Sequence, residues 1–179
     1  MNDIWMHPPV LGVAAFSGSG KTTLLSAVLP LLVERALRIG VVKHSHHDFE
    51  IDQPGKDSHR LRRSGACQTL IASPWRTAWI RENAVPQEPV LEELICRLQR
   101  DALDLVLVEG FRHENFPKIE IHRGGSGKPL LHAQDPHIIA LACDKPIKTP
   151  LPTLDLNNPP EVAEFIFSYV QSSRTGAAS

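Results

Sequence analysis

The sequence is poor in cysteine and almost free of net charge, and each scarcity excludes a class of protein. Three cysteines occur in 179 residues. They are far apart and form no C-x-x-C pair, so a disulfide framework is excluded and a reducing compartment is expected. The formal net charge is −1, whereas general nucleic-acid binding usually needs a strongly basic surface. We therefore expect no nucleic-acid partner, and any anion must bind at a local site.

Long hydrophobic runs are also missing. No stretch approaches the roughly 20 apolar residues of a membrane-spanning helix. The first ten residues, MNDIWMHPPV, contain an aspartate and two prolines where a signal peptide would be basic and then apolar. We therefore expect a cytoplasmic protein that crosses no membrane. With 42% hydrophobic residues, the chain can bury the core of one domain. We place that domain over residues 1–171 and a disordered Ser/Ala/Gly tail over residues 172–179.

The clearest motif is AFSGSGKTT at residues 15–23. It lies between the apolar run Val10–Ala15 and an amphipathic run, a context typical of a phosphate-binding loop, or P-loop. The strict pattern begins with glycine where this chain has Ala15, a small change in a turn position. Glycines inside the motif can adopt positive φ, which directs successive amides toward one anion. The alternative is a surface turn before an ordinary helix. The predicted nucleotide contacts are Ser17, Gly18, Ser19, Gly20, Lys21, Thr22 and Thr23.

Three side chains have distinct predicted roles at this loop. Lys21 is expected to reach the β- and γ-phosphate oxygens, and the Thr22 hydroxyl to ligate a bridging Mg²⁺. The apolar run Leu103–Gly110 resembles a Walker B strand and carries Glu109 near its end. At the carboxyl edge of a sheet, Glu109 could hold Mg²⁺ or orient an attacking water. The alternative is an acidic residue that ends a strand before a turn.

Strand-like and helical runs alternate along the chain, which predicts an α/β protein of the P-loop NTPase type, with a mostly parallel sheet flanked by helices. Pro30 interrupts the first helix and is expected to bend it. Two runs joined at residues 73–74 predict an added antiparallel hairpin. Its Trp75 and Trp79 either cover the core or form an oligomer surface. The expected strands are residues 10–15, 38–44, 67–73, 75–82, 103–110, 118–122, 137–143 and 153–156, and the expected helices are residues 24–36, 56–64, 90–100 and 160–170.

A histidine-rich loop follows the second predicted strand. His44 and His46 alternate along an extended segment, with His47 and Asp48 directly after them. A transition-metal site is therefore one hypothesis. Such sites usually take ligands from separated segments, and no thiolate or distant histidine is defined here. A polar contact near the γ-phosphate or near a second anion is the favoured interpretation.

Basic residues gather in two further segments. Lys56 with Arg60, Arg62 and Arg63 could receive a second anionic ligand, but this spacing places the arginines on no single tight face and favours a solvated helix. The run Arg123–Pro129 imitates a second P-loop. Its lysine, at position 128, precedes proline where the motif requires Ser or Thr, and no helical pattern follows. A flexible loop explains this run.

Five runs, in their order and spacing, resemble the MobB family, accessory GTP-binding proteins of molybdopterin guanine dinucleotide synthesis. The runs are FSGSGKTTLL, VVKHSHHDFEIDQPGKDS, RSGACQTLIASPWR, LDLVLVEGFRHENFPKIEIHR and IIALACD. The resemblance covers residues 10–145 and is weaker beyond them. It is specific because the KHSHHD…PGKD block is not a generic feature of P-loops.

The resemblance implies a homodimeric GTP-binding adapter with slow hydrolysis. It also implies a partner, the guanylyltransferase MobA, which joins GMP to molybdopterin, and it leaves molybdopterin itself open as a ligand. Phosphate and Mg²⁺ contacts carry over to Gly18, Gly20, Lys21, Thr22 and Thr23, and the Walker B carboxylate to Glu109. In the family's loop pattern, Asp48 or Asp57 would contact the ligands of Mg²⁺ rather than the ion itself. Lys56 would contact a phosphate or the partner's ligand. The alternative for each is a loop or capping residue.

The choice of base is the least determined feature. The guanine-reading motif Asn-Lys-x-Asp is absent, but Asp144 follows an apolar strand where related folds have a base-contacting loop. Its carboxylate could accept hydrogen bonds from guanine, a role the resemblance favours, or it simply ends the strand. Two other functions stay open. One is a P-loop small-molecule kinase, and the other is a metal-delivery GTPase that uses His44, His46 and His47.

Overall fold

The computed structural model describes residues 3–5, 7–45, 48–125 and 127–175. Contacts divide the chain into two compact units. Unit 1 comprises residues 1–44 and 90–179, and unit 2 comprises residues 45–89. The single domain predicted over residues 1–171 stays a prediction, within which these two units are described separately. None of the helices in the described residues is long and apolar enough to cross a membrane.

Unit 1 is built on a six-stranded sheet in which every neighbouring pair is parallel. The strand order is β2-β5-β1-β6-β7-β8. The inner strands β1, β5 and β7 carry buried apolar side chains on both faces, as covered parallel strands do, whereas the outer strands β2 and β8 are partly exposed. They are β1 (Val10–Ala14), β2 (Ile39–Lys43), β5 (Leu105–Glu109), β6 (Lys118–His122), β7 (Ile138–Cys143) and β8 (Thr153–Asp155).

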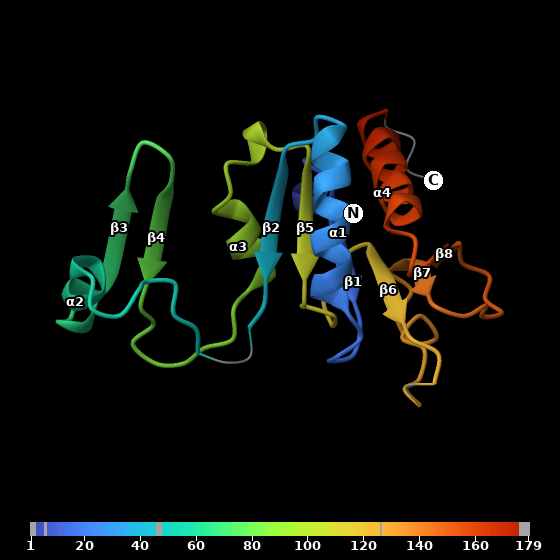
Figure 1. Ribbon diagram of the computed structural model, residues 1–179, viewed down its shortest axis with the longest axis horizontal. Coiled ribbons are helices and arrows are strands. Elements are labelled where there is room, and N and C mark those ends of the chain that lie inside the picture. Colours follow the sequence, from blue (N-terminus) through green and yellow to red (C-terminus); the bar gives the residue numbers. More distant parts are fainter. Residues whose placement is uncertain (1–2, 6, 46–47, 126, 176–179) are drawn as a thin grey trace. The chain divides into compact units, whose positions relative to one another are not determined.

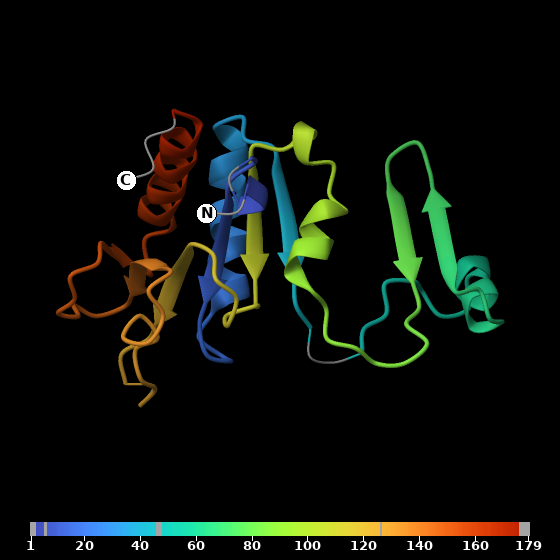
Figure 2. The same ribbon diagram turned by 180° about the vertical axis from the view of Figure 1, so that it is seen from behind.

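Helices cover the two faces of this sheet (Figures 1 and 2). The helices α1 (Lys21–Glu34) and α4 (Pro159–Arg174) pack on one face and share a buried cluster with β1, β5, β6, β7 and β8. The other face is covered by α3 (Leu91–Cys96) and by the 3-10 helix η1 (Asp3–Trp5). A second 3-10 helix, η2 (Arg100–Ala102), precedes β5. The result is a sheet between two helical layers, the arrangement of P-loop NTPases.

Gly12 shows how tightly the second face is filled. A Cβ atom on this residue would lie 2.5 Å from Cε2 of Phe116 and 2.7 Å from Cγ of Lys118. The Gly12 amide donates to the carbonyl of Pro117 at 2.8 Å. The crossover between β5 and β6 therefore rests directly on the backbone of β1, and only glycine admits that approach.

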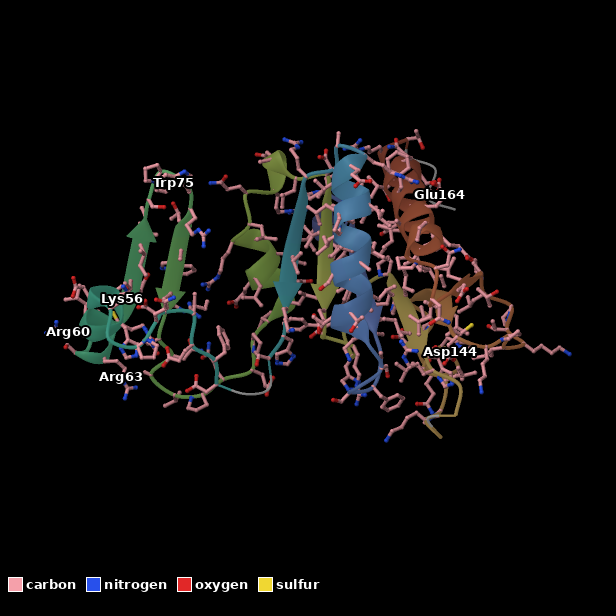
Figure 3. All side chains as sticks on the ribbon, viewed as in Figure 1. Lys56, Arg60, Arg63, Trp75, Asp144 and Glu164 are labelled. Carbon is pink, nitrogen blue, oxygen red and sulfur yellow. The ribbon has the colours of Figure 1, made fainter. Side chains whose placement is uncertain are left out.

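Unit 2 consists of α2 (Asp57–Arg63) and a two-stranded antiparallel sheet of β3 (Gln68–Ala72) and β4 (Thr77–Arg81). Arg62 joins these parts, because its guanidinium pairs with Glu82 at 2.7 Å and also with Glu50. Figure 3 shows Trp75 at the tip of the hairpin. Its side chain is 86% exposed and lies before β4, so Trp75 and Trp79 do not share a strand face.

The predicted fold class is confirmed, with two corrections of detail. First, the hairpin forms a sheet of its own and does not extend the parallel sheet. Second, the helix predicted over residues 90–100 ends at Cys96, while α4 continues to Arg174, three residues into the predicted tail. Pro30 lies inside α1. Residues 176–179 of the predicted tail lie outside the described residues.

Candidate functional site

The loop between β1 and α1 has the backbone of an anion cradle. Gly18 has φ +79° and Gly20 has φ +91°, values that glycine adopts without strain. Gly20 directly precedes α1, so the amino end of that helix faces the loop. No described residue accepts a hydrogen bond from the amides of Gly18, Gly20, Lys21 or Thr22. A phosphate group is the partner that such a set of amides suits.

Lys21 is folded back onto this loop. Its ammonium donates to the carbonyl oxygens of Ala15 at 3.2 Å and of Phe16 at 3.1 Å. Partial burial lowers the pKa of Lys21, the Glu109 carboxylate opposes that change, and the charge of Arg112 adds to it. The lysine therefore lies among loop carbonyls that a phosphate could replace.

The Walker B strand brings its carboxylate to the same loop. The Thr22 hydroxyl donates to Oε1 of Glu109 at 3.0 Å, although the two residues are 87 positions apart. The other oxygen, Oε2, pairs with Nζ of Lys43 at 3.4 Å. In the sheet, Lys43 lies directly opposite Glu109. A hydroxyl and a carboxylate at this separation are the hard oxygen ligands that Mg²⁺ prefers.

A sharp turn follows β5. Gly110 has φ +98°, and Phe111 has φ +52°, an uncommon value for a bulky residue. The Phe111 ring is buried and stacks on His44, with ring centroids 4.7 Å apart. A Cβ atom on Gly110 would lie 2.7 Å from Cβ of His44. The turn is thus held by packing against the end of β2.

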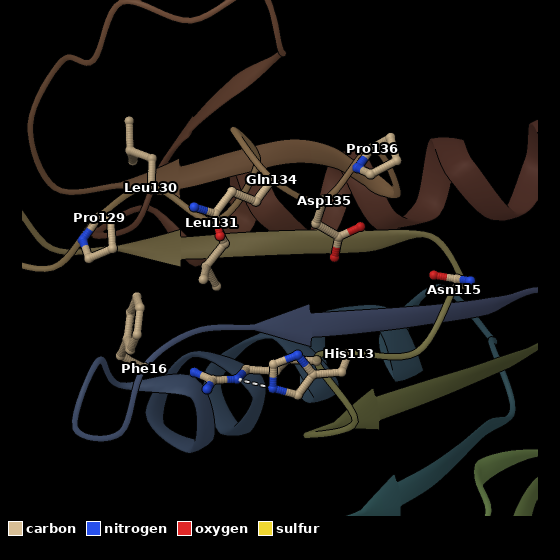
Figure 4. A pocket seen from close by; sticks show the side chains of 10 residues that line it. Phe16, His113, Asn115, Pro129, Leu130, Leu131, Gln134, Asp135 and Pro136 are labelled. Atoms are coloured by element: carbon tan, nitrogen blue, oxygen red, sulfur yellow. Dashed lines mark hydrogen bonds between the residues drawn. The ribbon is translucent and has the colours of Figure 1, made fainter.

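A pocket of about 350 Å³ opens beside the P-loop (Figure 4). Phe16 forms one end of it, while Asn115, Asp135 and Pro136 lie at the other. Arg112 lines the pocket and donates through Nε to Nε2 of His113 at 3.0 Å, the dashed line in Figure 4. Motif reasoning missed this pocket, because most of its lining comes from the loops between β5 and β6 and between β6 and β7, which no motif names. The remaining lining residues are Pro129, Leu130, Leu131 and Gln134.

The segment predicted to be a flexible loop after β6 reaches the P-loop as well. Nε of Arg123 donates to the carbonyl oxygen of Ser19 at 3.3 Å. The Gly124 amide donates to Oδ1 of Asp144 at 2.6 Å, and this hydrogen bond is the main cause that lowers the pKa of that carboxyl. Asp144 is thus hydrogen-bonded to Gly124, the residue directly after Arg123, and Arg123 contacts the P-loop. A base-contacting loop would require such a position.

Three other predicted residues lie in unit 2, which is described separately. Asp48, Lys56 and Asp57 belong to unit 2, so their roles at a nucleotide stay predictions. Within unit 2, Arg60 and Arg63 lie at the outer side of α2 in Figure 3, whereas Arg62 is turned inward and paired. The predicted basic cluster is thus not one surface.

Of the three histidines in the predicted metal site, His44 belongs to the described residues. His46 and His47 lie outside the described residues, and His44 stacks on Phe111. Among the residues that the structure describes, no group of three or more His, Cys, Asp or Glu side chains could hold a metal ion.

Comparison with known proteins points to one family. The MobB model, described as molybdopterin guanine dinucleotide synthesis protein B, matches residues 10–144. The molybdopterin-guanine dinucleotide biosynthesis adapter protein of Escherichia coli (strain K12) is 44% identical over 164 residues, which is 91% of this chain and 94% of that protein. The protein of the same name from Haemophilus influenzae is 41% identical over 162 residues, 90% of this chain and 89% of that one.

A solved structure of a MobB protein is also similar to this chain. The crystal structure of Bacillus subtilis MobB is similar with a TM-score of 0.72 and 28% identity, and the match covers 89% of this chain and 96% of that one. The segment matched by the family model contains the P-loop, the Walker B strand and Asp144.

Proposed function

The chain belongs to the MobB family of molybdopterin guanine dinucleotide synthesis proteins, and from that membership we propose that it is an adapter that binds GTP and Mg²⁺ between β1 and α1. The two curated relatives described above are adapter proteins of molybdopterin-guanine dinucleotide biosynthesis. An adapter role in that synthesis follows from the family. Nucleotide, metal ion and partner enzyme are the specific parts of the proposal.

The observation that carries the proposal is the 3.0 Å hydrogen bond between Thr22 and Glu109. It joins the P-loop threonine to the Walker B carboxylate, next to a loop in which the amides of Gly18, Gly20 and Lys21 have no acceptor among the described residues. These groups fit Mg²⁺, Thr22 as a direct ligand and Glu109 as a direct ligand or through a water. When bound, Mg²⁺ would supply positive charge beside the phosphate oxygens. Lys21 would exchange its two loop carbonyls for phosphate oxygens.

GTP is preferred over ATP because of Asp144. A carboxylate can accept hydrogen bonds from the N1 and N2 donors of guanine, whereas adenine offers no such pair. The lowered pKa of Asp144 keeps it ionised at neutral pH. We assign it to base recognition, with Gly124 holding its other oxygen in place.

Slow hydrolysis suits the surroundings of Glu109. Its two oxygens are already engaged by Thr22 and Lys43. Fast hydrolysis needs a group that orients the attacking water, and a carboxylate held on both sides is poorly suited to that task. The nucleotide therefore serves mainly as a bound ligand of the adapter.

The partners in this proposal are a MobA-like guanylyltransferase and a second copy of the chain. The hairpin of unit 2 supports the dimer. Leu70 and Trp79 lie directly opposite each other in the hairpin and are 68% and 44% exposed. A two-stranded sheet is marginally stable alone and has two open edges, so a second hairpin is a suitable partner. Molybdopterin would enter through the partner enzyme.

A small-molecule kinase is the second candidate, favoured by the pocket beside the P-loop. Its lining, with Arg112, Asn115 and Gln134, would suit a polar acceptor. Transfer of labelled phosphate from GTP or ATP to a small-molecule acceptor would favour the kinase over the adapter.

Calorimetric titration tests the proposed function. GTP and ATP are titrated separately with Mg²⁺ present, and then again with the guanylyltransferase present. We expect GTP to bind, ATP to bind at least tenfold more weakly, and the guanylyltransferase to alter the GTP affinity. The absence of GTP binding in both arms would overturn the proposal. Equal affinities for GTP and ATP would remove only the role of Asp144.

A further inference from the structure

Arg112 lies over the P-loop rather than pointing into solvent alone. Its guanidinium carbon is 5.3 Å from the ring centroid of Phe16, the second residue of the P-loop motif. The carbonyl oxygen of Phe16 accepts a hydrogen bond from the Lys21 ammonium at 3.1 Å. Two cations from different segments thus converge on one P-loop residue.

Strained backbone positions Arg112 there. Gly110 and Phe111, the two residues before it, both have positive φ. For a phenylalanine this conformation is unfavourable. The cost is balanced by burial of the Phe111 ring and its stacking on His44. Strain of this kind persists where the surrounding structure enforces it, and it often marks a functional site. Here it turns the chain so that the residue after Phe111 meets the P-loop.

Two cations lie near the ring of Phe16. Nζ of Lys128 lies 5.6 Å from the centroid of the same ring on which Arg112 lies. An aromatic ring attracts an exposed cation only weakly. Among the described residues, no carboxylate forms an ion pair with Arg112. Glu109 pairs with Lys43, and Asp144 lies 3.9 Å from Arg123. The site therefore favours an additional anion next to Arg112.

We propose that Arg112 contacts the terminal phosphate of a bound nucleoside triphosphate, so that the chain distinguishes triphosphate from diphosphate with a cation of its own. This inference rests on the proposed function. Arginine presents several donors in a fixed plane that matches phosphate oxygens. Phe16 holds that plane at the P-loop before nucleotide arrives, and His113 engages Nε and leaves the terminal nitrogens for the ligand.

The test compares two affinities in each variant. A non-hydrolysable GTP analogue and GDP are titrated with Mg²⁺ at one fixed ionic strength. In Arg112→Ala we expect affinity for the analogue to fall roughly 10- to 100-fold, the range for hydrogen bonds to charged groups. Affinity for GDP should change less than twofold. Arg112→Lys should recover part of the loss, because it restores the charge without the planar donor set.

Lys128→Ala is the matched control, since it removes the same charge from the same ring. A general effect of charge would weaken the analogue and GDP together, so the ratio of the two affinities should be unchanged in this variant. If the ratio of analogue affinity to GDP affinity fell as far in Lys128→Ala as in Arg112→Ala, the inference would be overturned. The general electrostatic effect of a lost positive charge, rather than a specific contact, would then explain the result in both variants.

The outcomes also separate this inference from the proposed function. If the wild-type chain binds both nucleotides and Arg112→Ala leaves their ratio unchanged, the contact is wrong and the adapter proposal stands. If the wild-type chain binds neither nucleotide, both are overturned. Arg112 is exposed, so thermal unfolding of the variant should match that of the wild type.

Discussion

At the scale of single residues, Glu109, the last residue of β5, connects this strand to the helix α1. Its carboxylate accepts from Thr22 and pairs with Lys43, so one side chain joins β5, α1 and β2. The glutamate is 13% exposed, and its charge is therefore less screened than that of a surface carboxylate. Both the shape of the site and its affinity for a cation depend on this one charge.

Glu109→Gln separates these two effects. The amide oxygen can still accept from Thr22, but the negative charge is lost. We expect the gain in GTP affinity that Mg²⁺ produces to shrink by roughly tenfold, since a charged ligand is worth about 1–3 kcal/mol more than a neutral one. Titration of GTP with and without Mg²⁺ measures that gain. An unchanged gain would exclude Glu109 from the metal site.

The sequence predicts individual site residues where a motif names them. The P-loop glycines, Lys21 and Glu109 are named because the ligand of such a motif fixes their spacing, and their roles at a ligand stay predictions. Arg112 was not found, because its position depends on a strained turn at residues 110–111 that no spacing rule encodes. Lys43 was likewise missed as a partner of Glu109, since strand register is set by long-range pairing.

At the scale of elements, Asp104 holds together three segments that are distant in sequence. It accepts from the amide of Arg38 at 2.8 Å and from its Nε at 2.9 Å, and it also pairs with Arg174. The side-chain hydrogen bond from Arg38 is the main cause that lowers the pKa of Asp104. This carboxylate therefore fastens the start of β2 and the end of α4 to the residue before β5.

Asp104→Asn should lower the free energy of unfolding in a manner that depends on pH. Because the pKa of Asp104 is lower in the folded state, its charge contributes fully above the unfolded value, near 4. The contribution is lost as pH falls through the folded pKa. The difference between wild type and variant should be largest at pH 7 and shrink below about pH 4, as measured by urea unfolding.

Asp57→Asn is the control for this prediction. Its carboxylate is 96% exposed and 3.8 Å from Arg60, so its charge should leave stability nearly unchanged. A difference for Asp104→Asn that stayed constant from pH 7 to pH 3 would show that lost packing, not lost charge, causes the destabilisation.

Elements were predicted better than their arrangement. Apolar runs with helical or strand spacing indicated nearly every helix and strand, because burial imposes those periods. The order of strands was not predictable in this way. β5 pairs with both β1 and β2, and this pairing joins residues far apart in the sequence. The hairpin was found from its turn, but that it forms its own sheet depends on tertiary contacts.

At the scale of the whole molecule, the hairpin of unit 2 leads to a prediction about assembly. Its exposed face carries Leu70 opposite Trp79, and Trp79 donates through its indole nitrogen to Gln68 at 3.2 Å. Apolar side chains on an exposed face of a marginal sheet favour association. We expect Leu70→Glu to shift the proposed homodimer toward monomer in sedimentation experiments.

Val33→Glu provides the matched control for the dimer. Val33 is also an exposed apolar residue, 59% accessible, but it lies on α1 in unit 1. It should leave the dimer intact. Loss of dimer in both variants, or in neither, would remove the hairpin as the interface.

The central claim is that the loop between β1 and α1 binds the phosphates of GTP through its amides and Lys21. The most direct measurement is calorimetric titration of GTP with Mg²⁺ into Lys21→Ala, with Lys148→Ala, an exposed lysine outside the site, as control. We predict that Lys21→Ala weakens GTP binding by roughly 100-fold or more while its thermal unfolding is unchanged, and that Lys148→Ala binds as the wild type does. Normal GTP binding by Lys21→Ala would contradict the claim.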